Sequence, residues 1–377
     1  MARQISSAPI RLLTAVPLCD GHDSAINTIN LELIRNGIEV IYLGYNRSAR
    51  DMVRAAIQED VRAIGISSYN GGHVEFFREV RQLLDKHGAS DIGLFGGGGG
   101  TITPRDAADM HRHGTDRIFF AGTPLQTVVD FVRDEYSKSR KSNSRSDGKN
   151  ADRELARQLT LAESNAGPKR KLSQKSPLTV GITGPGGAGK TTLIDELVYR
   201  FLRDQPESRI AILSHDPSIV GKGALLGDRA TMIYSQDDRV FMRSLATRGR
   251  AGGLSNATER CLQLLRASKF DLVFVETVGI GQEAIPFADK LVNQTILVLS
   301  PDYGSRLQLQ KIAMLDVAEM VVVNKSDQSG AKTALHELQS RLGDRHALLM
   351  STTASHHQDI GVDELFRVIN HRGKKDE

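Results

Sequence analysis

Strand-like and helix-like patterns alternate along the first part of the chain. The apolar runs IRLLTAV, EVIYLG, AIGISS, IGLFGG and RIFFAG predict strands, because each is short, apolar and bounded by turn residues. Between them, apolar positions recur at helical spacing, which predicts helices near 25–36, 48–58, 74–87, 104–113 and 124–135. This alternation is typical of a doubly wound parallel sheet, so we predict a flavodoxin-like domain over residues 1–136.

A second series of apolar runs begins after a polar stretch. PLTVGITG, RIAILSH, DLVFVET, QTILVLS and MVVVNK are almost continuously apolar, as expected for parallel strands buried on both faces. They predict a second domain over residues 177–377. The predicted fold class is therefore α/β, with two doubly wound parallel-sheet domains joined by a basic linker.

The linker, residues 137–176, is polar. It contains eleven Lys or Arg and four Asp or Glu, so its net charge of +7 exceeds the +4 of the whole chain and the remainder is slightly negative. Within it, Leu155, Leu159 and Ala162 recur at helical spacing, which predicts a short helix over 151–164 packed on one of the two domains. Because the basic residues gather in this stretch and aromatic residues are only 5% of the chain, we expect no nucleic-acid partner.

Composition narrows the class of protein further. The chain has 377 residues with 40% hydrophobic and 25% charged side chains, which is ordinary for globular domains. Two cysteines, Cys19 and Cys261, are too few for a disulfide scaffold and suit a reducing compartment. No apolar run is long enough to span a membrane, and the first residues lack the apolar region of a signal peptide. We therefore expect a cytoplasmic protein with no membrane partner.

A glycine-rich motif follows the first strand of the second domain. GPGGAGKTT fits G-x-x-x-x-G-K-[ST] and stands between a strand and a helix, which is the context of a phosphate-binding loop. Backbone N–H groups and the helix N-terminus would hold phosphate oxygens, while Lys190 would reach the β- and γ-phosphates and Thr191 would ligate Mg²⁺. The residues expected to bind nucleotide here are Gly184, Gly187, Ala188, Gly189, Lys190, Thr191 and Thr192.

The base of the nucleotide is indicated by a second motif. VVVNKSD places Asn324, Lys325 and Asp327 after a buried strand, in an N-K-x-D pattern. A carboxylate at this position accepts hydrogen bonds from the N1 and N2 edge of guanine, whereas adenine presents the opposite pattern. The motif therefore predicts GTP and GDP as ligands, and STTAS at 351–355 is a further candidate for a loop beside the base.

Seven motifs in order make the second domain resemble one family of GTPases. They are RELARQLTLAES, GPGGAGKTTL, DPS, LLGDR, RGRAGGLS, ETVGIGQE and NKSD. Over residues 151 to about 370 the chain is similar to the MeaB/ArgK-type GTPases, which are chaperones of cobalamin-dependent acyl-CoA mutases. The family often has a second Arg where this chain has Thr231, so a cationic contact to the nucleotide is in doubt there.

The resemblance implies a Mg²⁺ site and a group of residues that catalyse GTP hydrolysis. The Walker-B strand ends in Glu276 and Thr277 instead of the D-x-x-G of small GTPases. Catalysis would rest on Lys190, Glu276 and the switch residue Gln282. The residues implied to contact Mg²⁺ are Thr191, Asp216, Asp228 and Glu276, with Thr277 beside them.

The first domain carries its own three-part motif. Asp20 and His22 in DGHDSA follow the first strand, Ser67 opens SSYNGGH, and five glycines occupy 96–100. With this spacing the domain resembles, over residues 10–136, the cobalamin-binding domain of acyl-CoA mutases, whose pattern is D-x-H-x-x-G, S-x-L and G-G. Ala25 and Tyr69 depart from that pattern, which argues against a generic methyltransferase-type domain.

This resemblance implies a role for each element. His22 would donate a ring nitrogen to cobalt, and Asp20 would hydrogen-bond the other ring nitrogen and so raise ligand basicity. Ser67 would meet the displaced benzimidazole tail of the cofactor. The backbone at Gly97 and Gly98 would lie against that tail, and Gly122 with Thr123 would line the same cleft.

The two domains in this order resemble the N-terminal half of the fused isobutyryl-CoA mutases. The resemblance implies adenosylcobalamin as cofactor, a large subunit carrying the substrate-binding barrel as partner, an adenosyltransferase that delivers cobalamin, and an oligomeric assembly. The chain is then either a separate small subunit or a fragment of a longer protein. Two alternatives stay open: a cobalamin-delivery or cobalamin-sensing GTPase outside any mutase, and a metal-insertion GTPase using His111/His113 or His356/His357.

Overall fold

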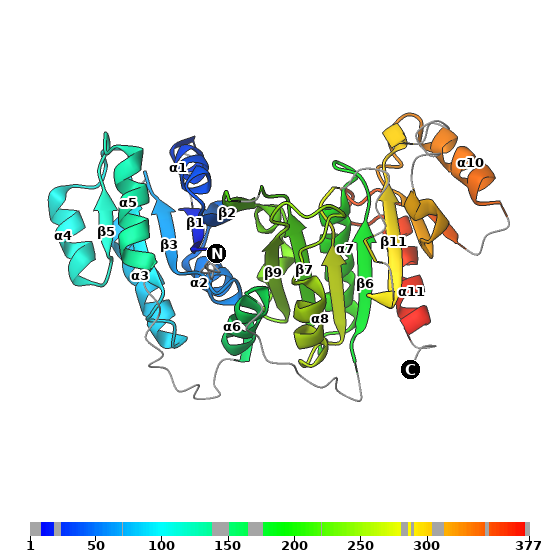
Figure 1. The fold of residues 1–377 in the computed structure, drawn as a ribbon, viewed down its shortest axis with the longest axis horizontal. Helices are drawn as coiled ribbons and strands as arrows, with labels where there is room; N and C mark the ends of the chain where they lie inside the picture. Colours follow the sequence, from blue (N-terminus) through cyan, green and yellow to red (C-terminus); the bar gives the residue numbers. More distant parts are fainter. Residues whose placement is uncertain are drawn as a thin grey trace, which may run out of the picture. The chain divides into compact units, whose positions relative to one another are not determined.

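The computed structural model describes residues 9–18, 24–69, 71–137, 151–164, 176–219, 221–279, 286–287, 290–303, 313–343 and 347–373. The chain divides into two compact units, each built on a parallel sheet, which confirms the predicted fold class (Figure 1). The first unit is Met1–Lys169 with Pro217–Ala230, and the second, the P-loop unit, is Arg170–Asp216 with Thr231–Glu377. These units differ from the predicted domains at two places, because the helix near 151–163 and the segment 217–230 both belong to the first unit.

The first unit has a six-stranded sheet in the order β5-β4-β3-β1-β2-β8, in which every pairing is parallel. Its first five strands have the flavodoxin-like order, in which ligands bind beside the carboxyl ends of the strands where the order reverses. The strands are β1 (Arg11–Pro17), β2 (Glu39–Arg47), β3 (Ala63–Ser67), β4 (Gly93–Gly97), β5 (Arg117–Phe119) and β8 (Ala224–Leu226).

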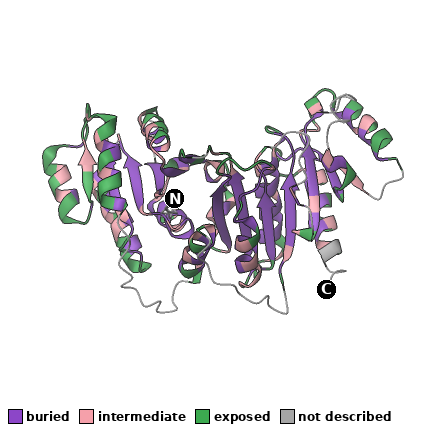
Figure 2. Cartoon of the chain, viewed as in Figure 1, coloured by how far each residue is buried: buried purple, intermediate pink, exposed green. Residues whose placement is uncertain are grey.

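Helices cover this sheet on both faces. Helix α1 packs beside α5, whereas α2 packs beside α3 and α6. Figure 2 shows strands buried along most of their length and helices exposed on one side, as amphipathic patterns require. The helices are α1 (Ser24–Arg35), α2 (Ala49–Gln58), α3 (His73–Lys86), α4 (Pro104–Arg112), α5 (Leu125–Tyr136) and α6 (Ala151–Glu163), followed by the 3₁₀ turn η1 (Asp228–Ala230).

Helix α6 is the helix that the apolar spacing of the linker predicts. Leu155, Leu159 and Ala162 are buried, and their face packs on the first unit. Arg153 and Arg157 both pair with Asp91, which fixes the helix from its polar side. The apolar spacing therefore predicted the helix correctly, and the structure shows which unit it covers.

The P-loop unit has a seven-stranded sheet in the order β13-β12-β11-β6-β10-β7-β9, again wholly parallel. The strands are β6 (Leu178–Thr183), β7 (Ile210–Asp216), β9 (Val240–Ala246), β10 (Leu272–Glu276), β11 (Gln294–Leu299), β12 (Met320–Val323) and β13 (Leu348–Ser351). The helices and 3₁₀ turns are α7 (Lys190–Asp204), η2 (Tyr234–Gln236), α8 (Thr258–Arg266), η4 (Pro301–Tyr303), η5 (Ala313–Asp316), α10 (Ala331–Leu342) and α11 (Ile360–Gly373). One apolar core joins α7 and α11 to the sheet, and a second core lies beneath α10.

Ten strands agree with the apolar runs of the sequence, whereas β8, β9 and β13 were not predicted. β8 and β13 are only three and four residues long, so they carry no measurable periodicity. β9 is longer, but Arg243 and Ser244 interrupt its apolar run, and both are buried in the structure.

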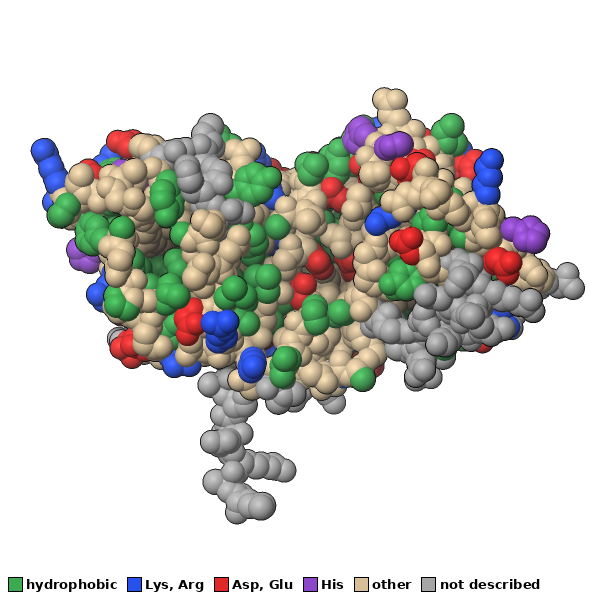
Figure 3. Space-filling view, turned by 90° about the horizontal axis from the view of Figure 1, so that it is seen from above, with side chains coloured by type: hydrophobic (Ala, Val, Ile, Leu, Met, Phe, Trp, Pro, Cys, Tyr) green, Lys and Arg blue, Asp and Glu red, His purple; other side chains and the backbone are tan. Residues whose placement is uncertain are grey.

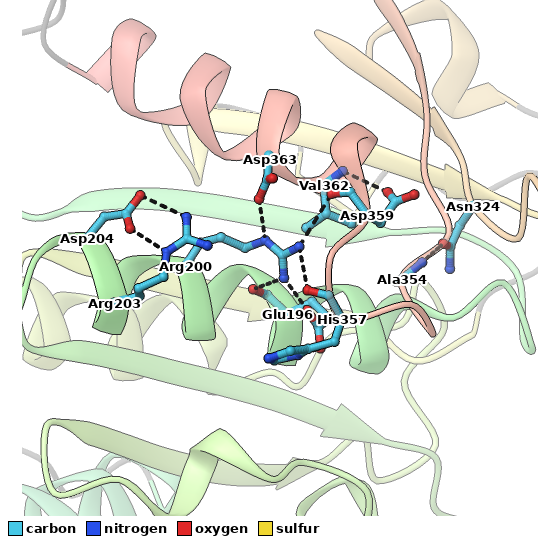
Figure 4. Close-up of polar contacts among 10 residues, drawn as sticks. All are labelled: Glu196, Arg200, Arg203, Asp204, Asn324, Ala354, His357, Asp359, Val362 and Asp363. Atoms are coloured by element: carbon cyan, nitrogen blue, oxygen red, sulfur yellow. Dashed lines mark hydrogen bonds and ion pairs between the residues drawn. The ribbon is translucent and has the colours of Figure 1, made fainter.

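A buried arginine fastens the helix after the phosphate-binding loop to the last helix (Figure 4). Arg200 of α7 is 1% exposed, and its Nε donates to Asp363 of α11 at 2.9 Å. Its other nitrogens bond Glu196 and the carbonyl oxygens of His357 and Asp359. Because a buried charge is tolerated only when it is paired, this network fixes the loop that leads into α11.

No helix among the described residues is long and apolar enough to cross a membrane. On the face drawn in Figure 3, basic and acidic side chains are interspersed with apolar ones across the described surface.

Candidate functional site

The phosphate-binding loop lies between β6 and α7, as the motif predicts. Gly184, Gly187 and Gly189 have φ of 144°, 76° and 86°, values that L side chains rarely adopt, so these positions require glycine. The ammonium group of Lys190 donates to the carbonyl oxygens of Gly184 and Pro185 at 3.0 and 3.1 Å. Lys190 therefore closes the loop from inside and lies where a phosphate would meet it.

Thr191, the next residue, contacts Glu276 at the end of β10, which is the Walker-B position. The Thr191 hydroxyl donates to Glu276 Oε1 at 2.7 Å, and Glu276 is 3% exposed at the end of β10. A hydroxyl and a carboxylate are hard oxygen ligands of the kind Mg²⁺ prefers, so the two residues fit the predicted metal. The hydroxyl of Thr277 instead lies 3.0 Å from Thr183 and donates to the Val278 carbonyl oxygen.

The remaining predicted metal contacts come from other elements of the chain. Asp216 ends β7, which pairs with β10, whereas Asp228 begins η1 in the first unit. Among the described residues no three His, Cys, Asp or Glu side chains form a group able to hold a metal ion. The switch residue Gln282 lies outside the described residues.

Asn324 ties the loop of the second motif to the phosphate-binding loop. Its Nδ2 donates to the Ala188 carbonyl oxygen at 2.9 Å, and its Oδ1 accepts from Ala354 N–H and the Thr352 hydroxyl, each at 3.0 Å. The buried amide of Asn324 thus joins three segments that are distant in sequence: the phosphate-binding loop, the NKSD loop and the STTAS loop at 351–355. Ser326 N–H donates to the Thr352 carbonyl oxygen, while Asp327 is exposed beside it, as a carboxylate that recognises a base should be.

Asp195 of α7 is buried and holds the backbone that follows residues 217–230, the segment that belongs to the first unit. Its two carboxylate oxygens accept from the backbone N–H groups of Ile233 and Tyr234, both at 2.9 Å. Burial raises the pKa of Asp195 to about 6, against the lowering effect of these two hydrogen bonds. Sequence reasoning missed this residue, because only the fold shows that its side chain is buried.

We expect Asp195 to make stability depend on pH. Because its folded pKa exceeds the unfolded value of about 3.9, its stabilising contribution is complete below pH 4 and is lost as pH rises through about 6. Lowering the pH from 7 to 5 should therefore raise the unfolding free energy of wild type by about 1 kcal/mol relative to Asp195→Asn. Urea unfolding at both pH values measures the difference, and an equal pH response of the two proteins would contradict it.

The first unit contains a cavity of about 380 Å³ beside the carboxyl halves of its strands. This volume is within the range of small-molecule sites. The predicted residues Ser67, Gly97, Gly98, Gly122 and Thr123 all line it. Further lining residues that the sequence did not single out are Thr14, Ile26, Phe95, Phe119, Phe120 and Leu125.

The glycine run is required by the sheet as well as by the cavity. A Cβ at Gly96 would lie closer than 3.0 Å to the Ile66 carbonyl oxygen, at Gly97 to that of Phe119, and at Gly98 to that of Ser68. At Gly99 it would meet the Tyr69 ring instead. The glycines were predicted to make room for a ligand, and the structure adds that neighbouring backbone approaches too closely for any side chain.

The Thr14 hydroxyl in the cavity wall indicates that the cavity binds a ligand. Thr14 of β1 is 2% exposed, and its hydroxyl makes no hydrogen bond within the described part of the chain. Buried hydroxyls are normally hydrogen-bonded, so a bound molecule with a polar atom would satisfy this one. The cavity therefore fits a ligand that is largely aromatic or apolar but has at least one hydrogen-bonding group.

The two residues with the most specific predicted chemistry, Asp20 and His22, lie outside the described residues. Three of the other four histidines considered from the sequence have identifiable side-chain partners. The Nδ1 atoms of His111 and His113 contact the carbonyl oxygens of Thr115 and Asp109, both at 2.9 Å. His357 lies 3.1 Å from Glu196.

Comparisons with known proteins assign each of the two units to a family. Residues 155–374 match the family model of the methylmalonyl Co-A mutase-associated GTPase MeaB, and residues 10–128 match that of the B12 binding domain. The chain is 38% identical over 398 residues to the fused isobutyryl-CoA mutase of Geobacillus kaustophilus, covering 95% of this chain and 36% of that protein. It is also 38% identical over 397 residues to the fused isobutyryl-CoA mutase of Cupriavidus metallidurans, covering 95% and 35%.

A third relative covers less than half of the chain. The methylmalonic aciduria type A homolog of Mus musculus is 36% identical over 195 residues, covering 46% of this chain and 46% of that protein. The chain spans about a third of the length of the two fused mutases. The chain therefore belongs to the family of methylmalonyl-CoA mutase-associated GTPases MeaB, with a B12 binding domain preceding the GTPase in the same polypeptide.

Proposed function

We propose that the chain is the adenosylcobalamin-binding part of an acyl-CoA mutase of the isobutyryl-CoA type, with a built-in GTPase that gates loading or repair of the cofactor. The proposal rests mainly on one observation, the glycine-walled cavity with its buried Thr14 hydroxyl in a unit that matches the B12 binding domain. The alignment of 95% of the chain with fused mutases supports the combination with a GTPase.

In the cobalamin-binding unit, the cavity would hold the aromatic tail of the cofactor. Thr14 and Ser67 offer it hydroxyl groups, and Phe95 and Phe119 offer it apolar walls. His22 would ligate cobalt, and Asp20 would hold the orientation of its ring. When bound, the cofactor would supply the radical chemistry that rearranges the acyl-CoA carbon skeleton, and the protein's part is to place and retain it.

In the P-loop unit, GTP would bind with Mg²⁺. Lys190 and the loop N–H groups would hold the phosphates, and Asp327 would recognise guanine. Asp216, Asp228 and Thr277 would complete the metal site begun by Thr191 and Glu276, and Gln282 would act in the switch. Hydrolysis should be slow until a partner completes the site.

The partners follow from this function. A substrate-binding barrel would come from a large subunit or from a longer polypeptide, since the chain aligns with about a third of each fused mutase. An adenosyltransferase would deliver the cofactor to an oligomeric assembly in the cytoplasm.

Electron paramagnetic resonance tests the cobalt ligand directly. We would load the chain with cobalamin, reduce it to the cob(II) form and record spectra with and without ¹⁵N-labelled histidine. A label-sensitive nitrogen splitting that His22→Ala removes and His113→Ala retains is the expected result. His113 is a suitable control because its side chain is 43% exposed at the end of α4.

The outcomes separate the remaining alternatives. Absent binding, or a splitting insensitive to the label, would exclude a histidine-ligated cofactor. Histidine ligation without carbon-skeleton rearrangement, after addition of a mutase large subunit, would favour a cobalamin-delivery or cobalamin-sensing GTPase over part of a mutase.

A further inference from the structure

His215 is the next-to-last residue of β7 and belongs to no nucleotide-binding motif. Its side chain is 2% exposed at the end of an apolar strand, where an imidazole needs hydrogen-bond partners. The ring Nδ1 lies 2.7 Å from the Glu276 carbonyl oxygen, and Nε2 lies 2.8 Å from the Thr258 hydroxyl. The imidazole therefore joins the end of β7 to the end of β10 and to the first residue of α8.

The backbone pairing between β7 and β10 ends before either strand does. β7 pairs with β10 as far as Leu213 and Val275, whereas its pairing with β9 continues to Asp216. The imidazole of His215 continues the connection to β10 beyond this point. Because a carbonyl oxygen can only accept, Nδ1 carries a proton and donates it to the hydrogen bond with Glu276. A side chain thus takes the place of the next backbone contact between the two strands.

The backbone at Glu276 is held on both sides. On the β6 side, Glu276 lies opposite Ile182, and the N–H of Thr277 donates to the Ile182 carbonyl oxygen at 3.0 Å. On the β7 side, the carbonyl oxygen of Glu276 accepts from His215. The carboxylate of the same residue accepts from the Thr191 hydroxyl at 2.7 Å. Because the backbone sets where the side chain begins, a backbone shift at Glu276 would move its carboxylate relative to Thr191.

Thr258 fixes the other edge of the imidazole. It is 2% exposed, and its hydroxyl lies 2.8 Å from His215 Nε2 and 2.8 Å from the Ser255 carbonyl oxygen. The N–H of Thr258 donates to the same carbonyl oxygen at 3.1 Å. Ser255 is the last residue of the RGRAGGLS motif, so the imidazole is anchored to the turn between this motif and α8. A rotation of the ring would break one of its two contacts.

We infer that His215 is a positioning residue for GTP hydrolysis, which holds the end of β10 so that the Glu276 carboxylate stays beside Thr191. This rests on the proposed function, in which Glu276 and Thr191 begin the metal site. His215 contacts the backbone of Glu276 and not its carboxylate, so it acts on the reaction through that residue. The affinity for GTP rests instead on the phosphate-binding loop and on Asp327, which lie on other elements. His215 should therefore affect the rate of hydrolysis and not the affinity.

Two amide substitutions separate the roles of the two ring nitrogens. The amide nitrogen of asparagine lies near the position of Nδ1, and that of glutamine lies near the position of Nε2. His215→Asn can therefore still donate to the Glu276 carbonyl oxygen, whereas His215→Gln reaches only Thr258. In single turnovers at saturating GTP and Mg²⁺, His215→Gln should lower the hydrolysis rate by about tenfold or more. His215→Asn should stay within about threefold of wild type, because it keeps the contact that positions Glu276.

GTP affinity and folding are measured on the same variants. The GTP dissociation constant should change by less than about twofold in both, because only the rate depends on the placement of Glu276. His336→Gln is the control, since His336 is exposed on α10 in the same unit and its replacement should leave the rate unchanged. If His215→Gln fails to fold, Thr258→Val decides. It removes the hydroxyl that anchors Nε2 and should slow hydrolysis by about threefold or more.

Failure of the positioning role can be told from failure of the proposed function. A wild-type chain that hydrolyses no GTP, or a Glu276→Gln variant as fast as wild type, removes the proposed role of Glu276. If wild type is active and Glu276→Gln is slow, equal rates of His215→Gln and His215→Asn overturn the positioning role alone. A loss of GTP affinity as large as the loss of rate, or Thr258→Val at the wild-type rate, overturns it as well.

Discussion

Replacing Lys190 with alanine should lower the rate of GTP hydrolysis by about 10²–10³-fold, the usual cost of losing a preorganised charged donor. The Lys190 ammonium donates to the Gly184 and Pro185 carbonyl oxygens, so it is held inside the loop where phosphate charge would develop. Because Lys190 is 6% exposed, water does not screen it as it would a surface lysine. Release of inorganic phosphate under single-turnover conditions measures the effect.

Lys332→Ala supplies the matched control for this substitution. Lys332 is exposed in the first turn of α10 in the same unit, so its removal should change the rate by less than about twofold. If Lys190→Ala hydrolyses GTP as fast as Lys332→Ala, the phosphate-binding role of Lys190 is wrong. Equal unfolding midpoints of the two variants would show that the effect is on the reaction and not on the fold.

Replacing Gly98 with alanine should weaken cobalamin binding by about tenfold or more, the equivalent of about 1.4 kcal/mol. The added methyl group would meet the Ser68 carbonyl oxygen closer than 3.0 Å, and backbone cannot rotate away as a flexible side chain can. β3 and β4 would have to separate at the wall of the cavity, at a stability cost of about 1–3 kcal/mol. Spectroscopic titration with cobalamin and urea unfolding measure the two effects.

Gly100→Ala distinguishes loss of the cavity from loss of stability. At Gly100 the Cβ would have open space, but φ is +97°, so alanine should cost about 1 kcal/mol of strain without touching the cavity. Both variants should therefore be less stable than wild type, and only Gly98→Ala should bind cobalamin weakly. Equal affinities of the two variants would show that this cavity does not hold the cofactor.

Motifs that act through local backbone could be predicted from the sequence. The phosphate-binding loop needs glycines, Lys190 and Thr191 at fixed spacing between a strand and a helix, so a short window of sequence contains its geometry. The same holds for Asn324 and Asp327. The structure also explains why an amide stands at position 324. The Asn324 side chain donates to the Ala188 carbonyl oxygen in the phosphate-binding loop and accepts from the Ala354 N–H in the loop after β13.

The cavity in the first unit was predictable only in part. Ser67 and the glycine run carry a recognisable spacing, and the structure places both in its wall. Thr14, Phe95 and Phe119 lie within ordinary apolar strands and carry no signal of their own. Their place in the wall depends on which face of each strand turns toward the cavity, and that is a property of the assembled sheet.

By itself the sequence determined the alternation of strands and helices, the two parallel sheets, the helix of the linker and the nucleotide motifs, because these depend on short-range periodicity and turn chemistry. Only the tertiary structure decided where residues 217–230 belong. Their strand is three residues long, too short for any period, and Arg229 reads as a surface charge until its partner, Glu59, is found 170 residues away. Buried polar pairs such as Arg200 with Asp363 and Asp195 with the N–H of Ile233 are hidden for the same reason, because each residue is stable in the interior only through a partner that the fold supplies.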